Sequence, residues 1–301
     1  MPLSDQPIAV TGATGFLGSH IALHLHEQGA RVSAVVRNPA KAAWLREQGI
    51  EVAVADLADP EAMRDAFEGV DAVVSAAALA TRERASWEAF HAANVVGSEN
   101  LMRACGEAGV RRVIHVSTIA VYRSRPFHLH DESTSFVGRW AGLARLVTNP
   151  RYGRSKAIGE RRAWELAEEY GIGLTVLRPG PILGSRDPKL TSRYARAFDR
   201  RVVAVPTFRI PHVHAGDVAL AVSGALRNPD STGRAYNVTG DSISPWEVLR
   251  AWKRRLGRGP LMVPIFLPVW IDYDDTAAAR DLGFRSRSLD ETLEEIMAAG
   301  S

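Results

Sequence analysis

Three glycines near the start of the chain, Gly12, Gly15 and Gly18, stand between a short apolar segment and a segment with helical character. In that context Gly12 permits a tight turn, Gly15 lets the backbone approach a pyrophosphate, and Gly18 lets the helix pack closely on the strand. The helix N-terminus adds free N–H groups and a positive dipole end. The motif predicts a dinucleotide-binding turn, although a glycine-rich turn that binds nothing has the same spacing. The predicted contacts are Gly12, Thr14, Gly15, Phe16, Leu17 and Gly18.

The first 178 residues alternate short β-branched segments with longer amphipathic segments, which is typical of a parallel sheet with crossover helices. The predicted strands are Ile8–Val10, Arg31–Val36, Glu51–Ala55, Ala72–Ser75, Arg112–Ser117 and Leu174–Arg178. The predicted helices are Gly15–Gln28, Ala40–Gln48, Pro60–Phe67, Trp87–Gly106 and Tyr152–Tyr170. We therefore expect an α/β fold in which residues 1–178 form a Rossmann-type doubly wound parallel sheet that binds NAD(P).

From Pro179 onward the pattern becomes irregular, and we expect residues 179–301 to form a smaller, mainly substrate-binding C-terminal lobe. One strand, Ala235–Thr239, and one helix, Leu289–Ala298, are predicted there, and we expect the strand to return to the sheet. The apolar segment Leu261–Ile271 is interrupted by prolines, so packing within the lobe is the default expectation. The alternatives are that it walls a pocket or attaches the lobe to a membrane surface.

Charge and cysteine content narrow the expected partners and compartment. The 301 residues include 37 Lys and Arg against 34 Asp and Glu without a basic tail, so we expect no nucleic-acid binding. The Arg-rich segment 193–201 is either a solvated helix face or a contact to an anionic substrate. No segment reaches the length that a membrane span needs, and because the segment before the first predicted strand is short and polar, we expect no signal peptide. The single cysteine, Cys105, cannot form a disulfide within the chain, so we expect a cytoplasmic protein. We expect its partner to be a small-molecule substrate, and a homodimer is compatible with the sequence.

The end of the second predicted strand bears on which dinucleotide is preferred. A carboxylate there would bind the ribose 2′-OH of NAD, whereas a cation would accept the 2′-phosphate of NADP. The strand ends in Arg37 without a carboxylate, and a guanidinium suits a phosphate. We therefore predict NADP as the cofactor in preference to NAD, with a solvated Arg37 as the alternative interpretation.

Tyr152 and Lys156 are four residues apart and share one face of a predicted helix. A phenol is a poor base at neutral pH, but an adjacent buried cation lowers its pKa, so the tyrosine can give or take a proton at an alcohol oxygen. Ser117 and Thr118 end the fifth strand, at the sheet edge where ligands bind. One of these hydroxyls could stabilise a substrate oxygen beside Tyr152. The alternatives are an exposed helix pair and hydroxyls that only satisfy backbone groups.

With these motifs the chain resembles the extended short-chain dehydrogenase/reductase superfamily, which includes NAD-dependent epimerase/dehydratases, dihydroflavonol-type reductases and 3β-hydroxysteroid dehydrogenases. The resemblance implies hydride transfer between the nicotinamide C4 and a carbonyl or secondary alcohol. It implies that Tyr152 acts as the acid and base and that Thr118 is its hydroxyl partner. It also implies that Lys156 binds the nicotinamide ribose, in addition to lowering the pKa of the tyrosine. Further cofactor contacts implied by the resemblance are Asp56, Leu57, Ala76, Ala77, Asn94, Ser117 and Pro179.

Three departures from the family pattern bear on the reaction. Ser75 stands where many members carry a histidine. Ile119 and Ala120 replace the Asp-Glu pair of dehydratases, so we do not expect lyase chemistry that needs those carboxylates. Pro181 replaces the asparagine that meets the substrate diphosphate in nucleotide-sugar epimerases. We therefore expect an oxidoreductase. The alternatives are a sugar or nucleotide-sugar epimerase and a non-catalytic dinucleotide sensor.

The segment 126–151 is predicted to be a loop over the active site, with Phe136, Trp140 and Leu143 lining a hydrophobic pocket or simply packing inward. It also holds a group of acidic and histidine residues. A metal site would need a better-matched set of ligands, so we expect none. The residues concerned are His128, His130, Asp131 and Glu132, together with His212 and His214 further along the chain.

Overall fold

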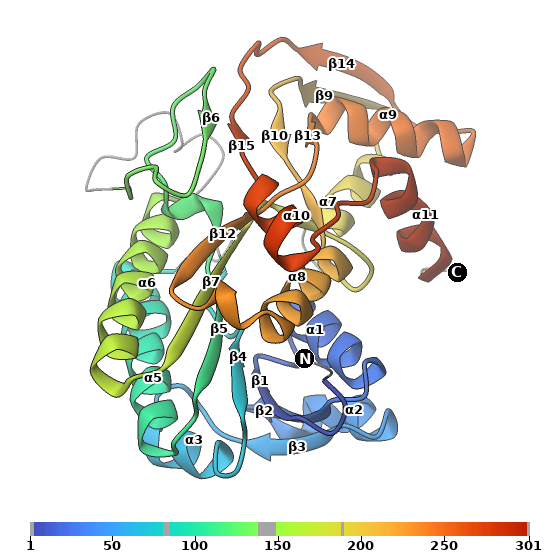
Figure 1. The fold of residues 1–301 in the computed structure, drawn as a ribbon. Coiled ribbons are helices and arrows are strands. Elements are labelled where there is room, and N and C mark those ends of the chain that lie inside the picture. The colour runs from blue at the N-terminus through green and yellow to red at the C-terminus, as the bar shows by residue number, and fades with distance from the viewer. Residues whose placement is uncertain (1–2, 81–84, 138–148, 188–189, 300–301) are drawn as a thin grey trace.

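The computed structural model describes residues 3–80, 85–137, 149–187 and 190–299. Its centre is a seven-stranded sheet with the order β12-β7-β5-β4-β1-β2-β3, in which every neighbouring pair is parallel (Figure 1). The strands are β1 Pro7–Thr11, β2 Arg31–Val36, β3 Glu51–Val54, β4 Ala72–Ser75, β5 Arg112–Val116, β7 Gly173–Pro179 and β12 Arg234–Val238. The order reverses between β1 and β4, as in a doubly wound sheet. The Rossmann-type fold is confirmed.

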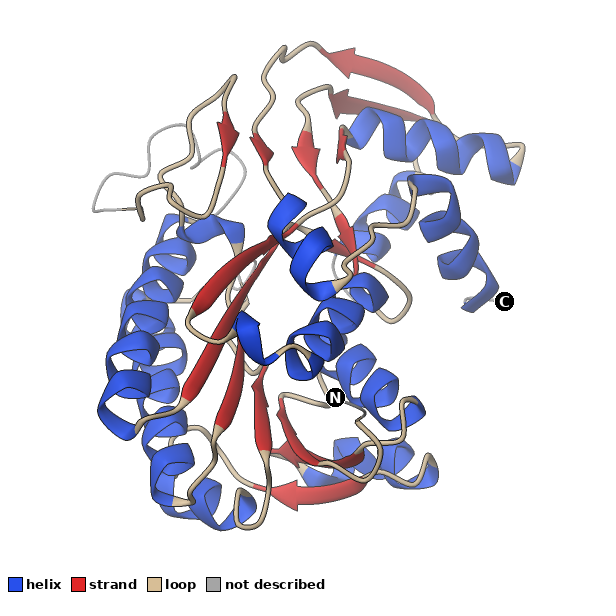
Figure 2. Ribbon diagram, viewed as in Figure 1, coloured by secondary structure: helices blue, strands red, loops and turns tan. Residues whose placement is uncertain are grey.

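Helices cover both faces of the sheet (Figure 2), and each face has its own apolar core. The helices on one face are α1 Phe16–Glu27, α2 Ala43–Glu47, α8 Ala215–Arg227 and α10 Thr276–Leu282. Those on the other face are α3 Pro60–Ala66, α5 Gly97–Glu107 and α6 Pro150–Tyr170. Because both faces are covered, the strands are apolar on both sides, which explains their near-continuous hydrophobic sequences.

The predicted elements of the first 178 residues are all found, but two of the predicted helices are not uniformly α-helical. The predicted helix Trp87–Gly106 consists of α4 Trp87–His91, a π-helical segment η2 Ala92–Val96 and α5. The predicted helix Ala40–Gln48 begins as a 3-10 turn, η1 Pro39–Ala42, before α2. A π-helical segment inserts an extra residue into the turn and is frequent at functional sites. It contains Asn94, one of the expected cofactor residues.

The second half of the chain is divided between the sheet and a separate lobe. The predicted strand at 235–239 does return to the sheet, as β12 beside β7. Helices α8 and α10 also pack on the sheet, which the sequence pattern did not predict. The remaining elements build a lobe with its own core, containing Val205, Val248 and Leu293. The lobe helices are α7 Leu190–Ala197, α9 Pro245–Leu256 and α11 Leu289–Ala299.

Short two-stranded sheets connect the lobe to the carboxyl ends of the central strands. The parallel pairs are β9 Val202–Pro206 with β14 Leu261–Ile265, β11 Val213–His214 with β8 Ile182–Leu183, and β15 Asp272–Tyr273 with β6 Leu129–His130. The antiparallel pair is β10 Ile210–Pro211 with β13 Ser242–Ile243. The expectation that the apolar segment 261–271 packs inside the lobe is largely wrong. Leu261, Val263 and Phe266 are exposed, because only one face of the β9–β14 pair meets the lobe core.

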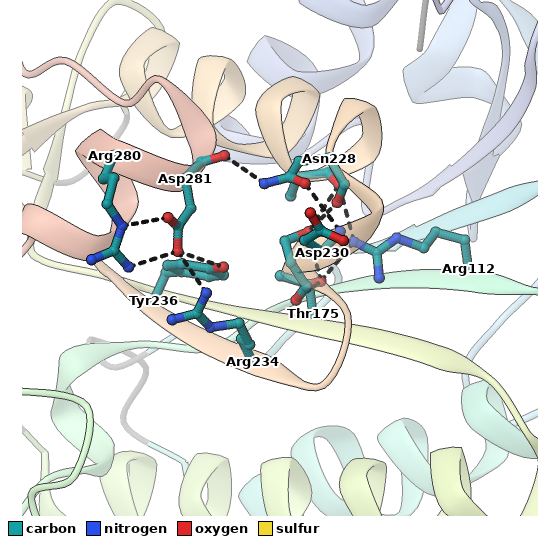
Figure 3. A network of polar contacts seen from close by, with 10 residues as sticks. Arg112, Thr175, Asn228, Asp230, Arg234, Tyr236, Arg280 and Asp281 are labelled. Atoms are coloured by element: carbon teal, nitrogen blue, oxygen red, sulfur yellow. Dashed lines mark hydrogen bonds and ion pairs between the residues drawn. The ribbon is translucent and has the colours of Figure 1, made fainter.

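Figure 3 shows the polar contacts that join the start of β5 to the 3-10 turn η5 Pro229–Ser231 after α8. The Arg112 guanidinium donates to the hydroxyls of Thr175 (2.7 Å) and Ser231 (2.6 Å) and to the Ala225 carbonyl (3.0 Å). Burial lowers the pKa of Arg112 to about 10. No carboxylate among the described residues pairs with it, so this cation is held by neutral acceptors, at the end of the sheet opposite the glycine-rich turn. None of the described helices is long and apolar enough to cross a bilayer.

Candidate active site

The glycine-rich turn joins β1 to α1 with close approaches that exclude a side chain. Gly12 has φ +70°, and a Cβ there would lie 2.9 Å from the Ala77 backbone. A Cβ on Gly18 would lie 2.2 Å from the Gly12 carbonyl oxygen. The hydroxyl of Thr11 accepts from the amides of Ala76 (3.1 Å) and Ala77 (3.3 Å), which fixes these residues beside the turn. The predicted residues Gly12, Ala76 and Ala77 are therefore brought together.

The N-terminus of α1 fits an anionic group. Gly15 caps the helix without a side-chain hydrogen bond, and the amides of Phe16, Leu17 and Gly18 have no acceptor among the described residues. The only neighbour that a Cβ on Gly15 would meet is the Gly12 carbonyl, so the backbone is open on its other side. Free N–H groups at a helix start with an open approach are what a dinucleotide pyrophosphate needs. The residues present therefore fit the expected cofactor.

Arg37, Asp56 and Leu57 lie at the ends of β2 and β3, as expected. The Arg37 guanidinium is 83% exposed and its Nε lies 3.8 Å from the Asp56 carboxylate. Asp56 also accepts from the Ala58 amide (2.9 Å), and the Leu57 carbonyl accepts from Asn100 (2.9 Å). At this exposure the Arg37–Asp56 pair adds little to stability, so the guanidinium is free to meet a ligand.

Tyr152 lies in the first turn of α6, beside the hydroxyl of Thr118, the residue that caps the 3-10 turn η3 Ile119–Val121 after β5. Part of the tyrosine remains exposed, yet burial around its phenol raises its pKa to about 12, while the neighbouring Thr118 hydroxyl opposes this rise. Helix α6 and η3 approach each other so closely that a Cβ on Gly153 would lie 2.4 Å from the Ala120 carbonyl oxygen. The glycine beside the tyrosine thus lets α6 approach η3.

Lys156 lies one turn further along α6 and is buried. Its ammonium donates to the Val116 carbonyl (2.9 Å) at the end of β5. Burial lowers the pKa of Lys156 to about 8, and the charge of Glu160 opposes this change. The group that lowers the pKa of Tyr152 in this structure is Thr118, so the expectation that Lys156 lowers it stays a prediction.

A buried network beneath these residues was not predicted from the sequence. The Glu160 carboxylate accepts from the Ser117 hydroxyl (2.6 Å) and from the Arg178 guanidinium (2.5 Å), and both charged side chains are at most 5% exposed. Arg178 also donates to the Tyr122 hydroxyl (2.6 Å), which donates to the Asn237 side chain (2.7 Å). The network ties α6 to β5, β7 and β12. The i, i+4, i+8 spacing of Tyr152, Lys156 and Glu160 was the available signal.

Asn94 and Pro179 occupy different surroundings. The Asn94 amide bonds both backbone groups of Leu79 (2.8 and 3.2 Å) and the Ser155 hydroxyl (3.0 Å). It therefore holds the chain after β4 against α6, close to the glycine turn. Pro179 ends β7 and is paired with Val238 of β12. The hydroxyl of Ser117, a residue expected to contact the cofactor, donates a hydrogen bond to the Glu160 carboxylate.

His115 of β5 lies beside Ser75 of β4, the position at which many family members carry a histidine. Its Nδ1 is 3.2 Å from the Ser75 hydroxyl, and its Nε2 is buried without a partner among the described residues. Burial, and then the charge of Lys156, lower the pKa of His115 well below its usual range. The imidazole is therefore neutral at physiological pH.

The predicted loop over the site is described in part. Phe136 forms an isolated antiparallel β-bridge with Tyr122, and its ring lies 5.0 Å from the Arg178 guanidinium. The Phe136 ring therefore covers the buried network. Trp140 and Leu143 lie outside the described residues. The Nε2 of His130 accepts from the Arg125 amide (2.9 Å). Within the described parts of the chain, no group of His, Cys, Asp and Glu is arranged to hold a metal ion.

Residues 8–239 match the family model described as the NAD dependent epimerase/dehydratase family. Tetraketide alpha-pyrone reductase 2 of Arabidopsis thaliana is 30% identical over 83% of this chain and 83% of its own length. Sterol demethylase protein B of Methylococcus capsulatus is also 30% identical, over 83% of this chain and 74% of its own length. Cinnamoyl-CoA reductase 1 of Petunia hybrida is 32% identical over 77% of this chain and 72% of its own length.

Solved structures share the fold over nearly the whole chain. UDP-glucuronic acid 4-epimerase of Bacillus cereus, in complex with NAD, matches with a TM-score of 0.82 and 19% identity, covering 98% of both chains. A short-chain dehydrogenase/reductase superfamily protein of Agrobacterium tumefaciens with bound NAD matches with a TM-score of 0.78 and 22% identity, covering 98% of this chain and 97% of its own. At these identities the likeness concerns the fold.

Proposed function

Because this chain belongs to the NAD-dependent epimerase/dehydratase family of enzymes, which use a nicotinamide dinucleotide, we propose that it is an NADP(H)-dependent reductase of carbonyl compounds. The observation that carries the proposal is the position of the Tyr152 phenol beside the Thr118 hydroxyl, at the carboxyl end of β5 and one helical turn from the buried Lys156. The glycine-rich turn of β1 and α1 ends at the same edge of the sheet. A proton donor and a dinucleotide turn at one sheet edge support hydride-transfer chemistry.

Tyr152, Thr118 and Lys156 each have a separate role in the proposed reduction. Tyr152 donates a proton to the substrate oxygen as it becomes an alcohol, and a phenol whose pKa is raised to about 12 holds that proton at neutral pH, which favours the reductive direction. Thr118 orients the phenol and offers a hydroxyl to the same oxygen. When bound, the cofactor supplies a hydride from nicotinamide C4. Lys156 holds the nicotinamide ribose, and its charge stabilises the phenolate left after proton transfer.

NADP is the proposed cofactor because the end of β2 offers a cation. The exposed guanidinium of Arg37 can form a bidentate contact to a 2′-phosphate. Asp56, the nearest carboxylate to it, lies at 3.8 Å and already accepts from the Ala58 amide.

The proposed substrate is a ketone or aldehyde without a nucleotide diphosphate. The named reductases among the relatives support a carbonyl substrate, and Pro181 removes the asparagine with which nucleotide-sugar epimerases meet a diphosphate. Sugar epimerisation is the rival function, supported by the family model and by the epimerase structures of the same fold. A non-catalytic sensor would need neither Tyr152 nor its Thr118 partner, so these residues argue against it.

We also propose a cytoplasmic location, since the single cysteine, Cys105, is fully buried and its thiol pKa is raised by burial. A homodimer stays a prediction that light scattering would test.

The test is a screen in which purified protein is offered aldehydes, ketones and UDP-sugars while NADPH or NADH absorbance is followed. The proposal predicts oxidation of NADPH with one or more carbonyl compounds and slower oxidation of NADH. Tightly held NAD in the purified protein, together with interconversion of UDP-sugars and no net cofactor oxidation, would establish the epimerase instead.

A further inference from the structure

The β9–β14 sheet has one face that is apolar and exposed. Val205 and Met262 point into the lobe core, toward α9. The opposite side carries the register pairs Leu261 with Val202, Val263 with Ala204, and Ile265 with Pro206. Leu261, Val202 and Val263 are 65%, 54% and 46% exposed. A sheet face open to water is ordinarily polar, so six apolar residues on this face are unexpected for a solvated surface.

The apolar surface continues past the end of β14. Phe266 is 78% exposed, and Leu267 and Trp270 are 41% and 40% exposed. The exposed ring of Phe127, in the loop before β6, makes an edge contact with Trp270 at 6.3 Å, and the Phe127 amide donates to the Trp270 carbonyl (2.8 Å). We call the outer face of β9–β14 and these four side chains the apolar patch. It lies at the end of the molecule where β6, β9 and β14 are found in Figure 1.

Arginines border the patch where its two strands begin. Arg200 and Arg201 directly precede β9, and Arg258 lies in the turn before β14. The Arg201 carbonyl accepts from the Leu261 amide (2.8 Å), which places the start of one strand beside the other. All three arginines are exposed and form no ion pair within the described residues. In the sequence, Asp199 directly precedes Arg200, and its one negative charge against the three arginines leaves the border with a net positive charge.

We propose that the apolar patch docks on the surface of a membrane that contains anionic phospholipids, without crossing it. Exposed Phe, Leu and Trp side chains enter the boundary between headgroups and acyl chains, and arginines at the edge are attracted to the negative surface. The positive border is what favours lipid over a second copy of this chain, whose surface would present arginines again. The proposal does not depend on the reaction that the active site performs.

Sedimentation with vesicles tests the proposal. Full-length protein is mixed with phosphatidylcholine vesicles with or without phosphatidylserine, at low and high salt. We expect binding that requires phosphatidylserine and weakens with salt. The double charge reversal Arg200→Glu with Arg201→Glu should weaken binding by about tenfold or more. Val263→Asp and Phe266→Ser should each weaken it as well, through the apolar contact.

Arg111→Glu is the matched control, because Arg111 is an 85% exposed arginine at the start of β5, away from the patch. NADPH binding by each variant verifies folding. The proposal is overturned if wild-type protein ignores phosphatidylserine vesicles at low salt, or if Arg111→Glu weakens binding as much as the patch variants. It is equally overturned if the wild type is a dimer that Val263→Asp dissociates, since a second copy then covers the patch.

Discussion

The hydroxyl of Thr118, which caps the turn after β5, lies beside the phenol of Tyr152 in the first turn of α6 and lowers the pKa of that phenol against the effect of burial. The same hydroxyl accepts from the Ala120 amide (3.2 Å), so its position is fixed by the turn. The two residues come from segments more than thirty positions apart, and Gly153 lets these segments meet. We therefore propose that Thr118 and Tyr152 act as a unit that presents one proton to the substrate.

Thr118→Val keeps the side-chain shape and removes the hydroxyl. We expect kcat for carbonyl reduction to fall by about 10- to 100-fold, because the phenol loses its orientation and the substrate oxygen loses a donor. The NADPH dissociation constant should stay unchanged. Steady-state kinetics with cofactor titration by fluorescence checks both. Ser135→Ala, an exposed hydroxyl in the nearby loop, is the control and should match wild type; an unchanged kcat in Thr118→Val would contradict the pairing.

Glu160→Gln should change the pH dependence of cofactor binding. The Glu160 charge raises the pKa of Lys156 against burial, which lowers it to about 8. Without that charge the pKa of Lys156 falls further, and the ammonium is lost at lower pH. NADPH affinity, which in wild type should weaken as pH rises through about 8, should then weaken at a lower pH.

The measurement for Glu160→Gln is the NADPH dissociation constant across that pH range. Glu168→Gln, an exposed carboxylate on the same helix, should behave as wild type. A uniform loss of affinity at every pH would mean that Glu160 acts only through the stability of the Ser117–Glu160–Arg178 network, and the electrostatic role would be rejected.

Arg37→Ala should reduce discrimination between the dinucleotides. We expect NADPH affinity to fall about tenfold or more while NADH affinity hardly changes, because the 2′-phosphate loses a charged partner. Isothermal titration with both cofactors measures the ratio. Lys41→Ala removes an exposed cation from the adjoining 3-10 turn and should leave the ratio as it is. Equal losses for NADPH and NADH in Arg37→Ala would rule out this assignment.

Arg112→Met should destabilise the fold without altering the chemistry. Its guanidinium donates to the hydroxyls of Thr175 and Ser231 and to the Ala225 carbonyl (Figure 3), and all three buried acceptors would lose this donor. We expect a loss of about 2–4 kcal/mol in the free energy of unfolding. Urea denaturation measures it. The neighbouring Arg111→Met, which removes an exposed side chain, should cost little; equal losses would show that the network carries no stability.

Local pattern was sufficient for the first half of the molecule. The central strands are buried on both faces and bounded by glycine, so their positions follow from short apolar segments. Helix α8 was missed because its sequence is rich in Ala and Val and is buried nearly all round, which removes the polar face that marks an amphipathic helix. The π-helical segment η2 likewise leaves no mark in the hydrophobic pattern.

The site was predicted where residues lie within one motif and missed where contacts are made across the fold. Tyr152 and Lys156 share a helix face, so their proximity follows from spacing. Arg178 and Glu160 lie on different elements, and their pairing depends on how α6 packs across β7. The exposure of Val263 depends on which face of β14 the lobe covers, which its apolar sequence does not reveal.

The proposed role of Tyr152 as proton donor is tested by measuring kcat/KM and the NADPH dissociation constant of Tyr152→Phe with the best carbonyl substrate from the screen. We predict a loss in kcat/KM of about 10²- to 10⁴-fold with unchanged cofactor affinity, because only the proton donor is removed. Turnover close to that of wild type would contradict it, since another group would then supply the proton.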